Sequence, residues 1–378
     1  GNRAGVVEEG DEENNADEDN AEPAEEENEE DPADDPSRWA DALTFSVNPF
    51  LVSEFNDHYP VVSPDGLHMA FTRGIGVLMI KDLATGDTRM LRDGWDSGLE
   101  YRFTPDAKWI VFDQADRNFN QDIFMVPVDG SADPINITRH PDNDGSPRLS
   151  ADGKSLAFRS ERKDEEFDVW YVFLDESLEQ MSSEERDEYF KENASAAKKK
   201  SLPKAADIRT ALEEIREGEV PDDEEYEAPF TTEDLQSAYL RLRRLTSLPG
   251  SESNVEMIPS GEKVVFTYSG GSPGSSGLYS VKYDGSGRKE LGDSASIAEI
   301  SADGSKLTAV SGGQAKLIDP SSGKAETMTI SDRVRINLEA QSTAKFNEAA
   351  RILSEWFYHP EMKGLDWDEL TEDYRVLA

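Results

Sequence analysis

A short turn motif recurs five times along this 378-residue chain, and this repeat constrains the fold more than any other feature. Each copy has proline or alanine, then an acidic or hydroxyl residue, then glycine or alanine, and leads into an apolar stretch. Proline, aspartate and glycine in this order are typical of a β-hairpin turn. The copies are Ser63-Pro64-Asp65-Gly66, Thr104-Pro105-Asp106-Ala107, Ser150-Ala151-Asp152-Gly153, Ile258-Pro259-Ser260-Gly261 and Ser301-Ala302-Asp303-Gly304.

A second apolar stretch follows each turn, so each repeat predicts two hairpins, or four strands. The first and second turns are 41 residues apart, the second and third 46, and the fourth and fifth 43. These intervals are near the ~40–45 residues of one propeller blade. The sequence therefore predicts a mainly β fold, a β-propeller of four-stranded blades, over a two-sheet sandwich. The second stretches are residues 77–80, 123–126, 169–172, 278–281 and 315–318.

An extra stretch of chain divides the predicted propeller. The third and fourth turns lie 108 residues apart, which is one blade plus about 63 residues. The extra residues are acidic and carry helix signals: a capping box of Ser182 and Glu185, and apolar residues at helical spacing before Gly218. We interpret this stretch as an insertion that hangs from one blade edge, after which strand pattern resumes at residues 239–242.

These patterns divide the chain into five parts. Five blades are clear, and the segments that flank them, residues 43–55 and 327–338, are candidates for a sixth blade that closes the ring. The expected parts are an acidic disordered segment at 1–38, blades at 39–174, an acidic helical or disordered insertion at 175–236, further blades at 237–335 and a helical segment at 336–378.

Charge and composition exclude several functions. The formal net charge is −41, so a groove that neutralises nucleic-acid phosphates is not expected, nor is an anionic membrane partner. The absence of cysteine excludes a thiol nucleophile and a disulfide framework. No apolar run approaches ~18 residues and no export signal begins the chain. These features predict a cytoplasmic protein, although export stays open.

The C-terminal segment changes from strand to helix spacing after Ile336. Ser342 is the expected N-cap of a first helix, and Pro360 its expected stop. A second helix is expected after Asp366, with Glu369 completing its cap. The first helix presents one apolar face, made by Phe346, Ala349, Ala350, Leu353 and Phe357.

The sequences of these repeats resemble those of two known groups of propellers. Residues 56–330, including the Arg139-His140-Pro141-Asp142 lead into the third turn, resemble the blades of tricorn-type proteases and of TolB-like proteins. Residues 346–367 resemble the opening helix and loop of the tricorn protease core domain, through the string Trp356-Phe357-Tyr358-His359-Pro360-Glu361-Met362-Lys363-Gly364-Leu365-Asp366-Trp367. Lys363 stands where that family carries histidine.

The resemblance implies a function for the chain as part of a larger protein. It implies the non-catalytic propeller portion of a tricorn-like serine peptidase, which gates or steers unfolded or peptide substrates to a catalytic domain outside this chain. Its partners would then be downstream PDZ-like and peptidase domains, and a homo-oligomer stays open. The alternative is a TolB-like propeller that acts as a protein-binding scaffold with no hydrolase. A prolyl-oligopeptidase-like propeller is a third and weaker hypothesis.

Several short motifs resemble catalytic or metal sites, but their residues are more typical of turns. Gly270-Gly271-Ser272-Pro273-Gly274 matches the nucleophile-elbow string, but Pro273 lacks the N–H that an oxyanion hole needs. Residues 116–122 space oxygen ligands as a calcium loop does, yet lack its sixth-position glycine. Asp142 and Asp144 are expected in an exposed turn. No serine or aspartate partner is suggested for the four histidines, His58, His68, His140 and His359.

We therefore predict no catalytic residue, no cofactor and no metal site in this chain.

Overall fold

The computed structural model describes residues 49–96, 98–163, 165–200, 203–218, 228–270, 276–328, 337–359 and 362–375. The chain divides into two units, Gly1–Glu54 and Phe55–Ala378. All helices and strands described below lie in the second unit.

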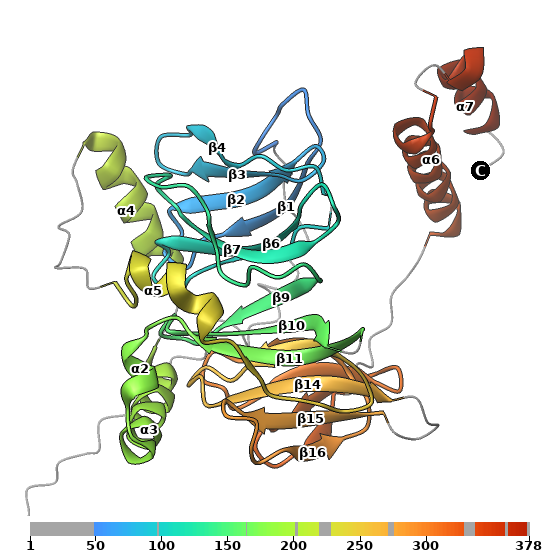
Figure 1. Cartoon of the computed structure of the whole chain (residues 1–378). Coiled ribbons are helices and arrows are strands. Elements are labelled where there is room, and N and C mark those ends of the chain that lie inside the picture. The colour runs from blue at the N-terminus through green and yellow to red at the C-terminus, as the bar shows by residue number, and fades with distance from the viewer. Residues whose placement is uncertain are drawn as a thin grey trace, which may run out of the picture. The chain divides into compact units, whose positions relative to one another are not determined.

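Twenty described strands form five antiparallel sheets of four strands each, and the sheets are the predicted propeller blades (Figure 1). Each blade uses four consecutive strands, but in blade 3 the helices of the insertion lie between the third strand and the outer strand. Blade 1 contains β1 (Asp57–Val62), β2 (His68–Arg73), β3 (Val77–Asp82) and β4 (Thr88–Arg92). Blade 2 contains β5 (Tyr101–Phe103), β6 (Trp109–Ala115), β7 (Gln121–Pro127) and β8 (Ile135–Asn136). Blade 3 contains β9 (Asp144–Leu149), β10 (Ser155–Lys163), β11 (Glu166–Phe173) and β12 (Arg243–Arg244).

The last two blades follow the same plan. Blade 4 contains β13 (Gly250–Met257), β14 (Lys263–Gly270), β15 (Gly277–Lys282) and β16 (Lys289–Gly292). Blade 5 contains β17 (Ser296–Ile300), β18 (Leu307–Ser311), β19 (Gln314–Ile318) and β20 (Ala325–Thr327). Most of the residues expected to form a sixth blade lie outside the described residues.

The repeated turn joins the first two strands of every blade and has one geometry throughout. Its last residue has a positive φ in each copy, from +60° at Ala107 to +82° at Gly261. In four copies the acidic residue accepts a hydrogen bond from a hydroxyl group two residues before it, as Asp65 does from Ser63 Oγ at 2.5 Å. The predicted hairpin turn is confirmed, and blade 2 shows that alanine is also accommodated at the glycine position.

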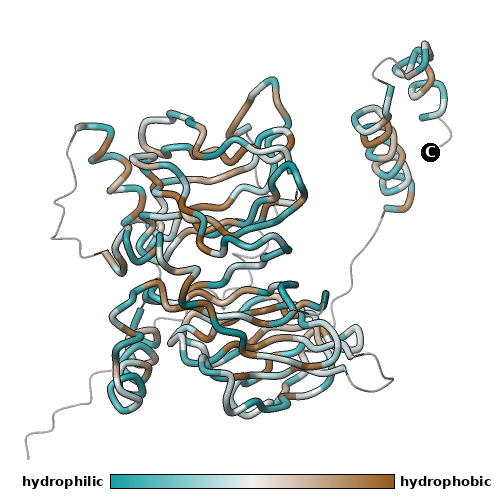
Figure 2. Tube along the Cα trace, viewed as in Figure 1, coloured by the Kyte–Doolittle hydropathy of each residue, from teal (hydrophilic) through white to brown (hydrophobic). Residues whose placement is uncertain are grey.

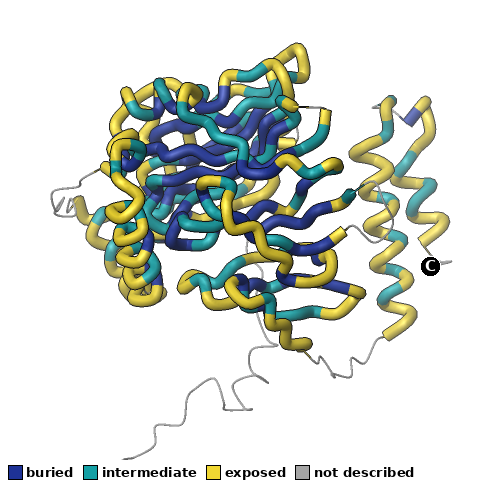
Figure 3. Tube along the Cα trace, turned by 60° about the horizontal axis from the view of Figure 1, so that its bottom comes forward, coloured by how far each residue is buried: buried dark blue, intermediate teal, exposed yellow. Residues whose placement is uncertain are grey.

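The core lies between neighbouring blades, where the apolar faces of two sheets meet. Four clusters of buried side chains join blades 1 and 2, 2 and 3, 3 and 4, and 4 and 5. Phe112, Phe158 and Phe266 are fully buried in three of them. Figure 2 shows hydrophobic residues along these strands, and Figure 3 shows that many of the same strands are buried.

Within its described residues, the insertion contains four α-helices, and a short 3₁₀ turn follows the last of them. They are α2 (Ser177–Gln180), α3 (Ser183–Lys199), α4 (Ala205–Glu217), α5 (Thr232–Ser237) and η2 (Ala238–Leu240). The capping box of Ser182 and Glu185 begins α3, and Gly218 ends α4 in the left-handed conformation, as predicted. Phe190 and Leu235 are buried against the blades, so the insertion packs on the propeller and does not merely hang from one edge.

The strand expected at residues 239–242 is wrong. Thr231 and Asp234 form a second capping box that begins α5, and the chain then continues through η2 to Leu240. The strand begins only at Arg243. A short capped helix therefore overrides the apolar alternation in this stretch.

The C-terminal segment contains α6 (Leu338–Trp356), η3 (Met362–Gly364) and α7 (Trp367–Arg375). The N-cap expected at Ser342 is wrong, because Asn337 caps α6 by accepting hydrogen bonds from the N–H groups of Glu339 and Ala340. The helix therefore begins more than one turn earlier than predicted. The start of α7 directly after Asp366 is confirmed, and the Asp366 carboxylate accepts a hydrogen bond from Glu369 N at 3.0 Å.

Candidate functional site

The first strands of four consecutive blades carry a charged side chain at one repeated position. This position is the third residue before the proline or alanine of the turn, and blade 1 has Val61 there. Strands at this place in a blade line the central axis of a propeller. The charged residues are Arg102 on β5, Arg148 on β9, Glu256 on β13 and Glu299 on β17. With Glu100, we call them the inner-strand cluster.

Arg148 is the centre of this cluster and joins three blades. Its Nε donates to Glu256 Oε1 at 2.7 Å, and its Nη1 donates to Glu100 Oε1 at 2.6 Å. Only 13% of the Arg148 side chain is exposed, so the two ion pairs are shielded from solvent. Burial alone would lower the pKa of Arg148, but the two carboxylates hold it above its usual value. Arg148 therefore stays charged, and its two ion pairs connect blade 3 with blades 2 and 4.

Arg102 has a looser environment than Arg148. Its Nη2 lies 3.9 Å from Glu100 Oε1 and 3.8 Å from Glu256 Oε1, and 43% of its side chain is exposed. Burial of the guanidinium and the positive charge of Arg148 lower the pKa of Arg102. Its Nε is buried and has no hydrogen-bond partner among the described residues. Because 43% of the side chain is exposed and its carboxylate contacts are long, the terminal N–H groups of Arg102 are available to an additional acceptor, such as a carbonyl or carboxylate group of a bound chain.

A bulge precedes the repeated position in three blades. Tyr59, Ser146 and Asn254 have φ values of +53°, +56° and +48°, and each lies five residues before the proline or alanine of its turn. The pairing register of β1, β9 and β13 with the next strand shifts beside these residues. Bulges of this kind bend a strand and redirect its side chains. The repeated position is therefore set by a repeated backbone feature.

Asp144 is buried, which corrects the expectation of an exposed turn. It lies on β9 with no exposed surface and forms an ion pair with Arg162 of β10. Burial raises the pKa of Asp144, and the nearby Arg162 opposes that rise. Asp142, two residues earlier, is exposed as expected. The flanking proline and glycine suggested a turn at both residues, but the first strand of blade 3 already begins at Asp144.

A second set of buried carboxyl groups lies between blades 3 and 4. Arg244 Nη2 lies 2.7 Å from Asp168 Oδ2, and Asp168 is buried. Glu252 is only 1% exposed, and neither of its carboxyl oxygens has a hydrogen-bond partner among the described residues. Burial, followed by the charge of Asp168, raises the pKa of Glu252 to about 8. Glu252 is therefore mostly protonated at neutral pH.

Asp113 of blade 2 is a further buried carboxyl group. Its oxygens accept hydrogen bonds from Glu100 N at 2.8 Å and Ser146 N at 3.0 Å, so it ties the start of blade 2 to β9. Burial raises the pKa of Asp113 to about 6, although these backbone donors oppose the rise. The position of Asp113 between two blades suits a structural link.

The nucleophile-elbow string and the stretch that resembles a calcium loop were the other motifs noted in the sequence. Gly270 ends β14, and the rest of the nucleophile-elbow string lies outside the described residues. Asp116 accepts hydrogen bonds from the N–H groups of Asn118 and Asn120 and closes the turn between β6 and β7. In the described part of the chain, no three acidic or histidine residues are grouped so as to hold a metal ion.

The histidines do not share a site. His58 is exposed on β1, His68 is half-buried on β2, and His359 accepts a hydrogen bond from Lys363 N at 3.3 Å. His140 does have an aspartate neighbour that the sequence did not suggest, because its Nδ1 lies 3.6 Å from Asp142 Oδ2. That contact joins residues two apart in one loop.

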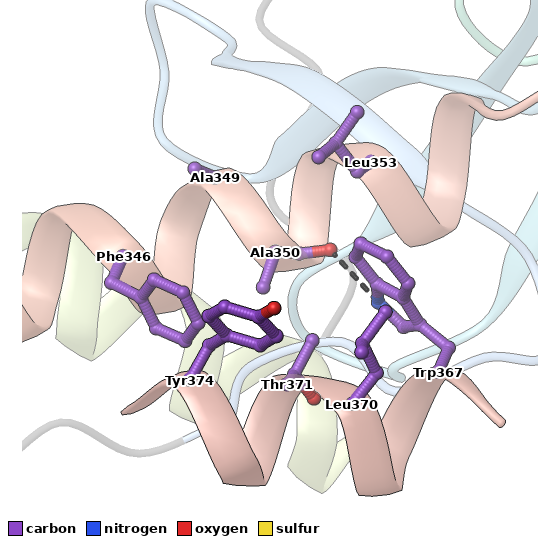
Figure 4. Close-up of a pocket in the computed structure, with 8 residues that line it drawn as sticks. All are labelled: Phe346, Ala349, Ala350, Leu353, Trp367, Leu370, Thr371 and Tyr374. Atoms are coloured by element: carbon purple, nitrogen blue, oxygen red, sulfur yellow. Dashed lines mark hydrogen bonds between the residues drawn. The ribbon is translucent and has the colours of Figure 1, made fainter. Parts of the chain in front are cut away.

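The C-terminal helices form a second candidate surface. Figure 4 shows side chains of α6 and α7 facing one another across a groove with a volume of about 170 Å³. Trp367 Nε1 donates to Ala350 O at 3.2 Å and holds the start of α7 against α6. The groove is lined by Phe346, Ala349, Ala350, Leu353, Trp367, Leu370, Thr371 and Tyr374. The predicted apolar face of α6 is therefore confirmed for Phe346, Ala349, Ala350 and Leu353. No helix in the described ranges is long and apolar enough to cross a membrane.

The inner-strand cluster was not identified from the sequence, although a signal for it was available. Aligning the five copies on their turns places Val61, Arg102, Arg148, Glu256 and Glu299 in one column. Four charged residues at one position of a strand are unusual because the same strands carry apolar residues elsewhere.

Comparison with known proteins finds similarity to tricorn-type proteases. The Tricorn protease C1 domain family matches residues 339–378. Tricorn protease homolog 1 of Streptomyces coelicolor is 26% identical over 346 residues, which cover 83% of this chain and 30% of that protein. The crystal structure of the tricorn protease aligns with a TM-score of 0.59 and 15% identity, over 85% of this chain and 31% of the other. TolB from Acinetobacter baumannii aligns with a TM-score of 0.43 and 12% identity, over 73% of this chain and 54% of the other.

The chain folds as a β-propeller of four-stranded blades, and a helical segment follows the propeller. The resemblance to tricorn-type proteases is confirmed, both in the propeller and at the start of their core domain. This chain spans about a third of the length of the Streptomyces relative and of the solved tricorn protease.

Proposed function

We propose that this chain is the non-catalytic propeller portion of a tricorn-like serine peptidase. The five blades gate or steer unfolded or peptide substrates toward a catalytic domain that is not part of residues 1–378. In this proposal, residues 39–174 and 237–335 supply the blades, residues 175–236 are an insertion, and residues 336–378 begin the core domain. The downstream partners are PDZ-like and peptidase domains of the parent chain.

One observation carries the proposal: a propeller with a charged inner-strand cluster leads directly into a segment that matches the Tricorn protease C1 domain. The cluster holds guanidinium and carboxylate groups on the strands that line a propeller axis. An extended peptide offers carbonyl and N–H groups along its whole length, and such groups bind charged side chains regardless of sequence. A surface of this kind suits a path for many different peptides.

Arg102 provides the sharpest test because its side chain is partly exposed and only loosely paired, whereas Arg148 is buried and already paired. Affinity for a fluorescent unstructured peptide would be measured by anisotropy for the wild-type chain and for Arg102→Gln. We expect the Kd to rise about tenfold, because a charge-assisted hydrogen bond is lost. Arg117→Gln is the matched control, since Arg117 is exposed in the turn between β6 and β7.

Two outcomes would contradict the proposal. Equal affinities for the Arg102 and Arg117 variants would show that peptides do not bind at the inner strands. Cleavage of the peptide by the purified chain, blocked by a serine-directed inhibitor, would show that these residues contain catalytic machinery.

A further inference from the structure

The insertion crosses the end of the propeller where the repeated turns lie. It contacts the turn regions of blades 1 to 4 and lines a cleft with the turn of blade 5. Figure 1 shows its helices along one side of the sheets. On α3, Tyr189 Oη and Asn193 Nδ2 donate to Asp152 of blade 3 at 2.5 and 2.7 Å. The same helix lines a cleft with the turns of blades 4 and 5. Phe230, just before α5, packs edge-on against Trp109 of blade 2.

The middle helix, α4, contacts blade 1 at two points. Ile208 packs against the repeated turn, so close that a Cβ added to Gly66 would lie 2.7 Å from its Cδ1 and Cγ2 atoms. Arg216 donates from Nε to Ala84 O at 2.9 Å and from Nη2 to Leu83 O at 3.1 Å, in the turn between β3 and β4. Both contacts lie at the same end of blade 1.

The three helices differ in how firmly they are held. Phe190 of α3 is 2% exposed and Leu235 of α5 is fully buried, and both belong to inter-blade core clusters. In contrast, α4 has no buried residue. Its apolar side chains, Ile208, Leu212 and Ile215, are only half-buried. The free energy that holds a helix in place follows the apolar area it buries, so α4 opens at a lower cost than its neighbours.

We propose that α4 is a releasable strap across the turn end of blade 1, anchored on both sides by α3 and α5. Release uncovers the two turns of blade 1 at Gly66 and Ala84 while the five blades stay folded. An isolated helix of 13 residues is marginal in water, so α4 loses its helical hydrogen bonds once it leaves the blade. The inference rests on the contacts of α4 and is independent of the proposed peptide path.

Gly66→Ala tests the strap with a matched control. Ala107 occupies the same turn position in blade 2 at φ +60°, so the turn accommodates alanine, but in blade 1 the added methyl group collides with Ile208. Gly153→Ala makes the same change at the same φ of +75°, where the nearest atoms, of Pro105 and Pro229, are 3.6 Å away. Amide hydrogen exchange of α4 would be followed by mass spectrometry. We expect exchange about tenfold faster in Gly66→Ala and unchanged in Gly153→Ala.

Arg216→Ala provides an independent second variant because it leaves the turn at Gly66 intact. It removes two hydrogen bonds to blade 1, so α4 should again exchange faster, while α3 and α5 stay protected. Arg209→Ala is its control, since Arg209 is exposed on the same helix. Unchanged α4 exchange in both variants would overturn the proposal. Joint opening of α3, α4 and α5 would overturn it as well, because the insertion would then move as one unit.

Discussion

The blades and the C-terminal helices use their apolar residues in opposite ways. In the blades, large side chains such as Phe112, Phe158 and Phe266 are fully buried between neighbouring sheets. Neither α6 nor α7 has a buried residue, and Trp356 and Leu353 of α6 are 77% and 51% exposed. Repetition lets each blade bury its faces against the next. Two helices alone cannot do so, and their groove remains open to a partner surface (Figure 4).

The strongest test of this contrast is a truncation in the blade core. Phe266→Ala removes a fully buried ring between blades 3 and 4. We expect the free energy of unfolding to fall by about 4 kcal/mol, from lost burial and the cavity left behind. Urea denaturation followed by circular dichroism measures it. A loss below about 1 kcal/mol would mean that the inter-blade core is not the main source of stability.

Removing one member of a buried ion pair should have the next largest effect. Arg162→Ala leaves Asp144 buried without its guanidinium partner, which should cost about 3 kcal/mol of stability. The double variant with Asp144→Ala removes the stranded carboxyl group and should recover part of the loss. A double variant that is as unstable as expected from two independent losses would show that the pair does not couple.

The pH dependence of stability should report on Glu252 between blades 3 and 4. Because its folded pKa is about 8, the folded chain holds a proton that the unfolded chain releases near its ordinary pKa of about 4.3. Stability contributed by this group therefore falls as pH rises through that window. Relative to Glu252→Gln, the wild type should lose about 2 kcal/mol between pH 5.5 and 7.

Denaturation curves of both proteins at several pH values test this expectation. The glutamine side chain has a similar shape and does not ionise, so titration of the other groups, including Asp113, cancels in the comparison. A difference between the two proteins that is independent of pH would rule out the raised pKa of Glu252.

The smallest effect is expected in the C-terminal helices. Trp356→Ala removes a large but 77% exposed side chain, so the free energy of unfolding should change by less than about 0.5 kcal/mol. The same urea titration measures it. A loss comparable to that of Phe266→Ala would show that α6 is already covered within this chain, and the contrast would fail.

The repeated turn made the blades predictable from sequence because each turn fixes its own backbone. Asp65 and its equivalents bond the adjacent hydroxyl and N–H groups, so the hairpins depend on a few neighbouring residues. The stretch near residue 239 was mispredicted because the capping box at Thr231 and Asp234, just upstream, decides its conformation.

The inner-strand cluster could not be predicted from neighbouring residues in the sequence. Arg148 and Glu256 lie 108 residues apart and meet only when blades 3 and 4 pack side by side. The burial of Asp144 likewise depends on Arg162, which comes from the next strand. Charged residues on a strand are normally assigned to solvent, so only the register of the repeats indicates that these face the axis.

We propose that these blades bind peptides without cleaving them. The most direct test of this proposal mixes the purified chain with a fluorescent unstructured peptide, records anisotropy over several hours and then weighs the peptide by mass spectrometry. We expect a saturable rise in anisotropy and a peptide of unchanged mass. A flat anisotropy curve, or fragments of the peptide in the same sample, would contradict it.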